Sequence, residues 1–390
     1  MMEKLYSDTL DHRNNFDVVR FILAVMVVLT HAYPIYYGTP QYKTLEPLML
    51  FTHGQLTFGT MAVGFFFMIS GFLVLKSLLY SKSTTGFITK RVLRIYPAFI
   101  VVSLFCAIIV VPLGNGGMGQ ALPDFSHYWS STSLRYLARS TATLKAVYLP
   151  ETLSNVPIIN VTNGSIWTIR YEFGLYLLLA LLGMTRLFKV HKLVPLFIFL
   201  AVLSINVLHH EGYVHWLHTG KMPGFYLPPF LAPYREQYLW TEHFLLYFTS
   251  GMCFYACRDY IPRSRYLMLL SVVVLLITAR WTTAFELTVS VFGAYLLFYF
   301  TFSSKIRLHN FAKYGDFSYG IYLFGWPIQQ LVTLYLGKQI GFYGTLFTSI
   351  AFVIPIAFLS WHLVEKPALS LKNKSIGFRK LKDLKASPAD

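Results

Sequence analysis

Residues 17–35, DVVRFILAVMVVLTHAYPI, form an apolar run that is long enough to cross a lipid bilayer as one helix. Further apolar runs follow at approximately residues 60–79, 95–113, 165–184, 193–209, 240–257, 266–280, 284–302, 318–336 and 343–364. The sequence therefore predicts an all-α polytopic integral membrane protein with about ten transmembrane helices.

The composition supports lipid as the main solvent of this chain. Charged residues make up 13% and hydrophobic residues 55% of the 390 positions, whereas soluble domains carry about 25% charged residues. The segment before Val18 is polar, and the apolar run after it lacks a small-residue cleavage site. We expect a first helix that is retained rather than a cleaved signal peptide.

The excess of Lys and Arg over Asp and Glu is explained by the membrane topology. With an even number of helices and both termini in the cytoplasm, most of the 33 Lys and Arg residues fall in cytoplasmic segments. The net charge of +16 therefore does not indicate a nucleic-acid partner. The expected parts are a cytoplasmic N-terminal segment (1–16), a ten-helix membrane domain (17–367) and a basic cytoplasmic tail (368–390). Two long outer loops are expected at 114–164 and 210–239.

Cysteines and clustered histidines provide no metal signature. Cys106, Cys253 and Cys257 lie in apolar runs, where core or lipid-facing thiols are expected. Four histidines cluster in an outer loop, for which an interfacial or acceptor-facing role is expected rather than zinc binding; they are His209, His210, His215 and His218.

The first predicted helix carries three ionisable residues, Asp17, Arg20 and His31. Arg20 and His31 are about three helical turns apart and share one face, and Asp17 lies on nearly the same stripe. Such a stripe is a plausible wall of a pore, because ionisable groups inside a bilayer are costly and usually functional. The alternative is an Asp17–Arg20 pair at the membrane interface, with His31 bonded to a neighbouring helix.

Two further groups of charged residues are candidates for a catalytic or ligand-binding role. Glu172 enters the membrane from the outer side at a depth comparable to His31, so the two side chains could pair. The alternative is a structural Arg170–Glu172 pair, although residues two apart on a helix do not face each other. Between the second and third spans, Lys90, Arg91 and Arg94 form either a positive-inside anchor or a cytoplasmic phosphate clamp.

Six blocks of the chain resemble, in order, the motifs of the acyltransferase 3 family of membrane O-acyltransferases. These blocks are Asp17-Val-Val-Arg20 with His31 after ten further residues, 63–72, 91–97, 163–172, 318–323 with Trp326-Pro327, and 365–367. The resemblance covers about residues 14–367. One departure is Gly325, because many relatives have a histidine directly before the Trp-Pro or Phe-Pro pair.

The resemblance implies acyl transfer from cytoplasmic acetyl-coenzyme A, a donor rather than a permanently bound cofactor, to a hydroxyl of an exported glycan such as O antigen or exopolysaccharide. His31 would act as the base, or carry the acyl group transiently, with Glu172 or Asp17 in support. The residues implied for the coenzyme are Arg20, Ser70, Lys90, Arg91 and Arg94. Those implied for the acceptor are Asn163, Trp167, Tyr322 and Trp326.

Other functions remain open from the sequence. A transporter or flippase of a lipid-linked glycan would also need buried charges, but it does not predict the six ordered blocks, and no internal repeat is visible. Within the enzyme class, the acyl group could be succinyl, and the acceptor could be a lipid or a small molecule. A membrane scaffold without chemistry does not explain the stripe of Asp17, Arg20 and His31.

Overall fold

The computed structural model describes residues 14–39, 45–115, 131–144, 153, 155–219, 234–303, 306, 308 and 310–371. Within these residues, every element is a helix and no strand occurs. The chain divides into two compact units. Unit 1 comprises Met1–Tyr80 and Leu181–Tyr314, and unit 2 comprises Ser81–Ala180 and Gly315–Asp390.

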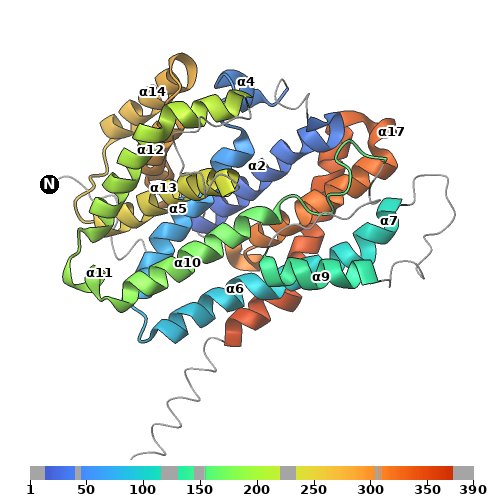
Figure 1. The fold of residues 1–390 in the computed structure, drawn as a ribbon, viewed down its shortest axis with the longest axis horizontal. Coiled ribbons are helices and arrows are strands. Elements are labelled where there is room, and N and C mark those ends of the chain that lie inside the picture. The colour runs from blue at the N-terminus through green and yellow to red at the C-terminus, as the bar shows by residue number, and fades with distance from the viewer. Residues whose placement is uncertain are drawn as a thin grey trace, which may run out of the picture. The chain divides into compact units, whose positions relative to one another are not determined.

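Unit 1 is built around α5, which contacts both α2 and α13, while α13 also contacts α12 (Figure 1). Its helices are α2 (Phe16–Tyr37), α4 (Pro47–Phe51), α5 (Phe58–Leu79), α11 (Leu187–Val190), α12 (Val194–Thr219), α13 (Arg235–Ala256), α14 (Arg265–Trp281), α15 (Phe285–Thr288), η5 (Val289–Gly293), α16 (Ala294–Thr301) and η6 (Phe311–Tyr314).

Two glycines allow α5 and α13 to approach at backbone distance. A Cβ atom on Gly71 would lie 1.9 Å from the carbonyl oxygen of Phe248, and a Cβ atom on Gly251 would lie 1.9 Å from that of Met68. Close approach at small residues is typical of helix pairs in membranes, where van der Waals contact rather than the hydrophobic effect drives association.

Unit 2 contains α6 (Thr84–Phe105), η1 (Cys106–Val110), α7 (Val111–Asn115), α9 (Ser131–Thr143), η2 (Ile166–Thr168), α10 (Ile169–Met184, with its last residues in unit 1), α17 (Ser318–Ser360) and η7 (Trp361–Glu365). Gly341 interrupts α17 with a φ of 66°, a conformation that glycine adopts at little cost. The two parts of α17 pack together, since a Cβ atom on Gly320 would lie 2.8 Å from Ala357 Cα. This break agrees with the predicted separation of the last two spans.

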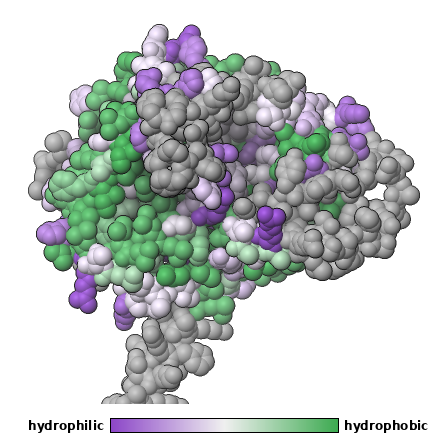
Figure 2. Space-filling model, in the orientation of Figure 1, coloured by the Kyte–Doolittle hydropathy of each residue, from purple (hydrophilic) through white to green (hydrophobic). Residues whose placement is uncertain are grey.

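Six helical segments of the described chain are long and apolar enough to cross a membrane: Phe16–Tyr37, Phe58–Leu79, Thr84–Gly114, Ile166–Met184, Val194–Gly212 and Ser318–Leu371. Large apolar side chains are exposed on α12 and α14, among them Leu208, Leu269 and Leu276. Figure 2 shows hydrophobic residues covering much of the left side of the visible face. The protein is therefore a polytopic helical membrane protein. The count of ten helices and the orientation of the termini remain predictions.

The structure corrects two expected boundaries. The helix expected at 95–113 begins at Thr84, because the Ser83 hydroxyl accepts a hydrogen bond from Gly86 N at 3.1 Å and caps it. The block 91–97, called the arginine motif below, is therefore helical rather than part of a connection. The histidines expected in an outer loop are also helical, since α12 continues through Thr219. Residues 1–13 and 372–390, most of the two predicted terminal segments, lie outside the described residues.

Candidate active site

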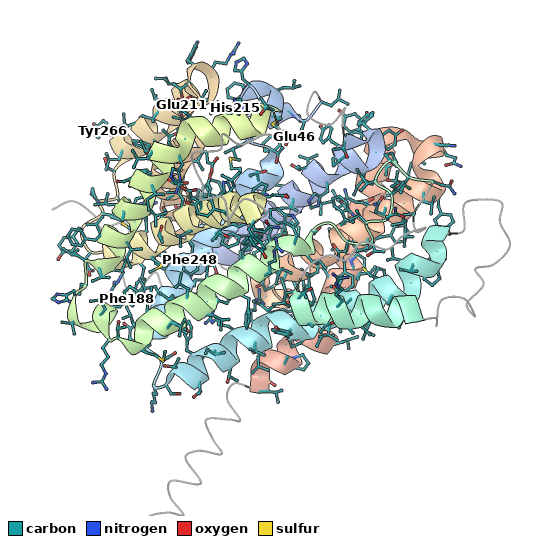
Figure 3. All side chains as sticks on the ribbon, in the orientation of Figure 1. Glu46, Phe188, Glu211, His215, Phe248 and Tyr266 are labelled. Atoms are coloured by element: carbon teal, nitrogen blue, oxygen red, sulfur yellow. The ribbon has the colours of Figure 1, made fainter. Side chains whose placement is uncertain are left out.

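In unit 1, the turn of α2 that carries His31 is held by its neighbour Thr30. The Thr30 hydroxyl accepts a hydrogen bond from Gly59 N at 2.7 Å and donates one to Glu46 Oε1 at 3.2 Å. Glu46 is fully buried and also accepts from Phe58 N at 2.7 Å and Met49 N at 2.6 Å. One carboxylate therefore binds the N-termini of α4 and α5 and fixes the His31 turn against them (Figure 3, which labels Glu46).

Gly59 makes this contact a close one. A Cβ atom at position 59 would lie 3.0 Å from Thr30 Cβ, closer than side-chain atoms normally approach. The close contact brings the first turn of α5 directly against the turn before His31. His31 itself is half-buried on α2, on a segment whose backbone is set by α5.

The start of α2 carries the other two ionisable residues of the predicted stripe. Arg20 donates a hydrogen bond to Asp17 Oδ1, and the pair is part-exposed, with 22% and 35% of the side-chain surfaces accessible. Asp17 and Arg20 therefore pair, as one of the two alternatives from the sequence expects, and the position of the pair at the membrane interface remains a prediction. Ser70 lies buried on α5, so unit 1 contains Asp17, Arg20, His31 and Ser70 together.

In unit 2, Arg94 is bound by two acidic side chains. Its guanidinium donates to Asp316 Oδ2 at 2.8 Å and lies 3.5 Å from Glu365 Oε2. Asp316 also accepts from the Ser318 hydroxyl at 2.5 Å, and Glu365 from the Ser360 hydroxyl at 3.2 Å. Arg94 thus links α6 to Asp316, two residues before α17, and to Glu365 at the end of η7.

Arg91, one turn before Arg94 on α6, has different surroundings. Its guanidinium carbon lies 5.6 Å from the ring centres of both Phe87 and Tyr176. The Tyr176 hydroxyl donates to Glu172 Oε1 on the same helix, α10. Tyr176 therefore connects the arginine motif with the predicted acidic residue, inside unit 2.

The two charged residues near the start of α10 have separate contacts. Arg170 donates to the Tyr171 hydroxyl at 2.7 Å and lies 4.6 Å from that ring centre, whereas Glu172 accepts from Tyr176. The side chains at positions 170 and 172 thus follow the geometric expectation that residues two apart on a helix do not face each other.

The four predicted acceptor residues belong to unit 2. Three of them take part in hydrogen bonds that hold residues 161–165 against α17. Asn163 donates to Leu323 O at 2.9 Å, and the Tyr322 hydroxyl donates to Ser165 O at 2.6 Å. Trp326 donates to Val161 O at 3.2 Å. These three residues are buried. Their contacts position the entry to α10, which carries Glu172.

Gly164 completes this loop contact, since a Cβ atom there would lie 2.7 Å from the Trp326 ring. Trp167, the fourth predicted residue, is less buried and packs edge-on against Tyr171 with ring centres 5.8 Å apart. Of the predicted acceptor residues it is the one with the most accessible side chain.

The structure thus assigns the predicted residues to two sets. Lys90, Arg91, Arg94, Glu172 and the four acceptor residues belong to unit 2, and His31 with its stripe belongs to unit 1. The proposed pairing of His31 with Glu172 joins the two sets and remains a prediction.

Sequence reasoning missed Glu46 and Asp316, and it missed two histidine–glutamate pairs, of whose residues it had singled out only His209. Glu46 and Asp316 lie outside the apolar runs, so the pattern did not mark them. The pairs His209–Glu242, with a 2.9 Å contact between Nδ1 and Oε1, and His243–Glu286 lie on α12, α13 and α15. Their signal was visible, because ionisable residues within apolar spans are rare. Among the described residues, no group of three His, Cys, Asp or Glu side chains could hold a metal ion.

Comparison with known proteins identifies the family. Residues 13–364 match the model of the acyltransferase 3 family, described as an acyltransferase domain. The chain is 28% identical over 374 residues to a protein named O-acetyl transferase from Shigella phage Sf6, covering 92% of this chain and 97% of the relative. It is 27% identical over 383 residues to Nodulation protein 10 of Rhizobium leguminosarum bv. viciae, covering 94% and 96%.

No solved structure matches the chain significantly. The family match nevertheless extends over nearly the whole sequence and includes every predicted site residue. The protein is a multi-pass membrane acyltransferase, and the chain belongs to the acyltransferase 3 family.

Proposed function

We propose that this protein transfers an acetyl group from cytoplasmic acetyl-coenzyme A to a hydroxyl of an extracytoplasmic glycan such as O antigen or exopolysaccharide. The observation that carries the proposal is the family match over residues 13–364, together with a full-length relative named O-acetyl transferase. The acyl donor and the glycan are the parts of the proposal that the experiment below tests.

His31 is the proposed general base. A hydroxyl is a weak nucleophile at neutral pH, and an imidazole within hydrogen-bond reach accepts its proton as the new C–O bond forms. The C–S bond of the thioester then breaks, and the proton passes to the departing coenzyme sulfur. The network of Glu46 and Thr30 supports this role, because it fixes the backbone that carries His31.

Arg91 and Lys90 are the proposed ligands of the coenzyme phosphates. Both are half-buried on the first half of α6, and cationic side chains recognise phosphate through charge-assisted hydrogen bonds. Arg94, a further predicted phosphate ligand, already contacts Asp316 and Glu365. We therefore propose that its main contribution is to hold α6 in place, which presents the Arg91 side chain.

The proposed topology has ten membrane-spanning helices with both termini in the cytoplasm, in the bacterial inner membrane. Beyond the six clear segments, α13, α14 and the run α15–η5–α16 would each cross, and Gly341 would divide α17 into two crossings. In this orientation the N-terminal half of α6 faces the compartment in which acetyl-coenzyme A is made.

The test combines glycan analysis with an assay of purified protein. Cells that produce wild-type protein should carry acetyl esters on surface polysaccharide, detected by proton NMR and mass spectrometry, and cells with His31→Ala at equal protein level should not. Purified wild-type protein should release free thiol from acetyl-coenzyme A only when an acceptor is present. Unchanged glycans in the wild-type, variant and deletion strains would exclude a surface glycan as the acceptor.

A further inference from the structure

Unit 1 contains a polar pocket that the proposed reaction does not use. It lies between α12, α13 and α15, and its polar lining consists of Asn206, His209, His210, Glu242, His243 and Glu286. The space between these side chains is about 20 Å³, and a cavity needs roughly 10–15 Å³ to hold one water-sized group. The pocket therefore accommodates a single small polar group within apolar helices.

The lining side chains are held in defined orientations by pairing. His209 Nδ1 lies 2.9 Å from Glu242 Oε1, and His210 Nε2 lies 3.0 Å from the Thr283 hydroxyl. His243 Nδ1 pairs with Glu286 Oε1. The two histidine–glutamate contacts use one oxygen each of Glu242 and Glu286. The lining side chains therefore hold their orientations without a bound ligand.

The hydrogen bonding of Glu286 in this pocket is incomplete among the described residues. Glu286 is 7% exposed, and its Oε2 atom is buried and receives no hydrogen bond from the residues that the structure describes. A buried carboxylate oxygen without a donor is unfavourable, and nearly all such atoms in proteins have a partner. A hydrogen-bond donor that enters the pocket would satisfy this oxygen.

A hydroxyl fits this position better than a metal ion. Among the described residues, no three acidic, histidine or cysteine side chains are arranged for a metal, whereas a single hydroxyl fills the space and donates to one oxygen. Trp240 packs edge-on against the His243 ring, with centres 5.5 Å apart, which adds an aromatic surface beside the pair. Aromatic side chains next to hydrogen-bonding groups suit a ligand with both apolar and polar faces.

We propose that this pocket is a subsite for the acceptor glycan, in which a sugar hydroxyl donates a hydrogen bond to Glu286 Oε2. The identity of the ligand as the acceptor rests on the proposed function. In the proposed topology, the C-terminal end of α12 and the N-terminal end of α13 lie on the outer side, where a glycan is available.

The subsite is near the level of His31 within unit 1. Gly59, on the first turn of α5, contacts Thr30 beside His31, and Gly64 on the same helix contacts Tyr247, one turn after His243. These two glycines are about 8 Å apart along the helix axis. An oligosaccharide is long enough to place one hydroxyl in the subsite and another near His31.

Equilibrium binding tests the subsite independently of catalysis. Methyl glycosides of neutral hexoses and deoxyhexoses are titrated into the purified full-length protein without acetyl-coenzyme A, and binding is followed by saturation-transfer NMR. Glu286→Gln removes the charge while keeping the shape and should weaken binding about tenfold, the difference between a charged and a neutral acceptor. Leu287→Phe, which adds bulk to the lining, should weaken binding without any change of charge.

Glu211→Gln is the matched control. Glu211 is an exposed residue of α12 outside the pocket lining (labelled in Figure 3), and its replacement should leave binding unchanged. Glycoside binding that falls in both pocket variants supports the subsite even if the protein transfers no acetyl group, an outcome that would reject the proposed function alone. Absence of binding to wild type at millimolar concentrations, or equal affinity of Glu286→Gln and wild type, overturns the subsite.

Discussion

The turn before His31 in unit 1 and the Arg94 cluster in unit 2 are both anchored by buried carboxylates, but through different chemistry. Glu46 is satisfied by two backbone N–H groups and one hydroxyl. Asp316 and Glu365 instead share a single cation, Arg94. The first arrangement distributes one charge over neutral donors, and the second depends on an opposite charge.

This difference determines what a substitution does. A neutral acceptor can replace a carboxylate that binds N–H groups, so the Glu46 network should tolerate isosteric change. Removing the shared cation leaves two buried carboxylates without a neutralising charge, which is strongly destabilising. Substitutions in the network around Glu46, beside the proposed base His31, should therefore have graded effects. Loss of Arg94 should disrupt all the contacts of its cluster at once.

The largest expected effect is the loss of catalysis in His31→Ala. Loss of a general base costs about 10²–10⁴ in rate, and the KM for acetyl-coenzyme A should change little if His31 acts on the acceptor. The measurement is steady-state thiol release by purified protein. His215→Ala, at an exposed position of α12 (labelled in Figure 3), is the control and should retain full activity. A His31→Ala variant with near-normal kcat would remove His31 from the reaction.

Arg94→Ala should lower stability by about 3–5 kcal/mol, because Asp316 and Glu365 lose their cation. The readout is thermal unfolding in detergent, compared with Arg280→Ala at an exposed position. Adding Asp316→Asn to Arg94→Ala should recover part of the loss. A stable Arg94→Ala protein with a raised KM for acetyl-coenzyme A would instead favour the phosphate-binding role expected from the sequence.

Glu46→Ala should lower stability by roughly 1.5–3 kcal/mol, the value of hydrogen bonds to a charged group, and should also lower kcat. Glu46→Gln, which keeps an acceptor oxygen for Phe58 N, should restore most of both. The kcat of each variant is measured at a temperature at which it is folded. Equal kcat in Glu46→Ala and wild type would show that Glu46 stabilises the helices without positioning His31.

Arg91→Ala has the smallest expected effect of the four. Loss of one phosphate contact of about 1.4 kcal/mol corresponds to a tenfold higher KM for acetyl-coenzyme A, with kcat nearly unchanged. Arg186→Ala, at an exposed cationic position, serves as the comparison. An Arg91→Ala variant with unchanged KM would show that the coenzyme phosphates bind elsewhere.

Within each unit, some polar residues were predictable from the sequence and others were not. His31 and Glu172 were recognisable because an ionisable group in an apolar run stands out in any sequence. Asp316 and Glu46 lie in polar connections, where a carboxylate is ordinary. Only packing shows that Asp316 meets Arg94, which lies 222 positions away, or that Glu46 binds the start of α5.

Helix ends near polar residues were the least predictable local features. The hydropathy pattern placed the third span at 95–113, whereas the helix begins at Thr84, because capping by Ser83 is independent of hydropathy. Likewise, α12 continues through His209, His210 and His215, since pairing with Glu242 and Thr283 satisfies two of these side chains within the helix.

The sequence by itself determined that the chain lies in a lipid bilayer, that it is helical and which family it belongs to. The first two depend on the length and order of apolar runs, and the family depends on motifs that can be read residue by residue. The tertiary structure decided which charges compensate one another, which glycines permit backbone contact, and that one oxygen of Glu286 has no donor among the described residues. The physical reason is that the energy of a buried charge depends on partners brought from distant parts of the chain, and no local pattern records them.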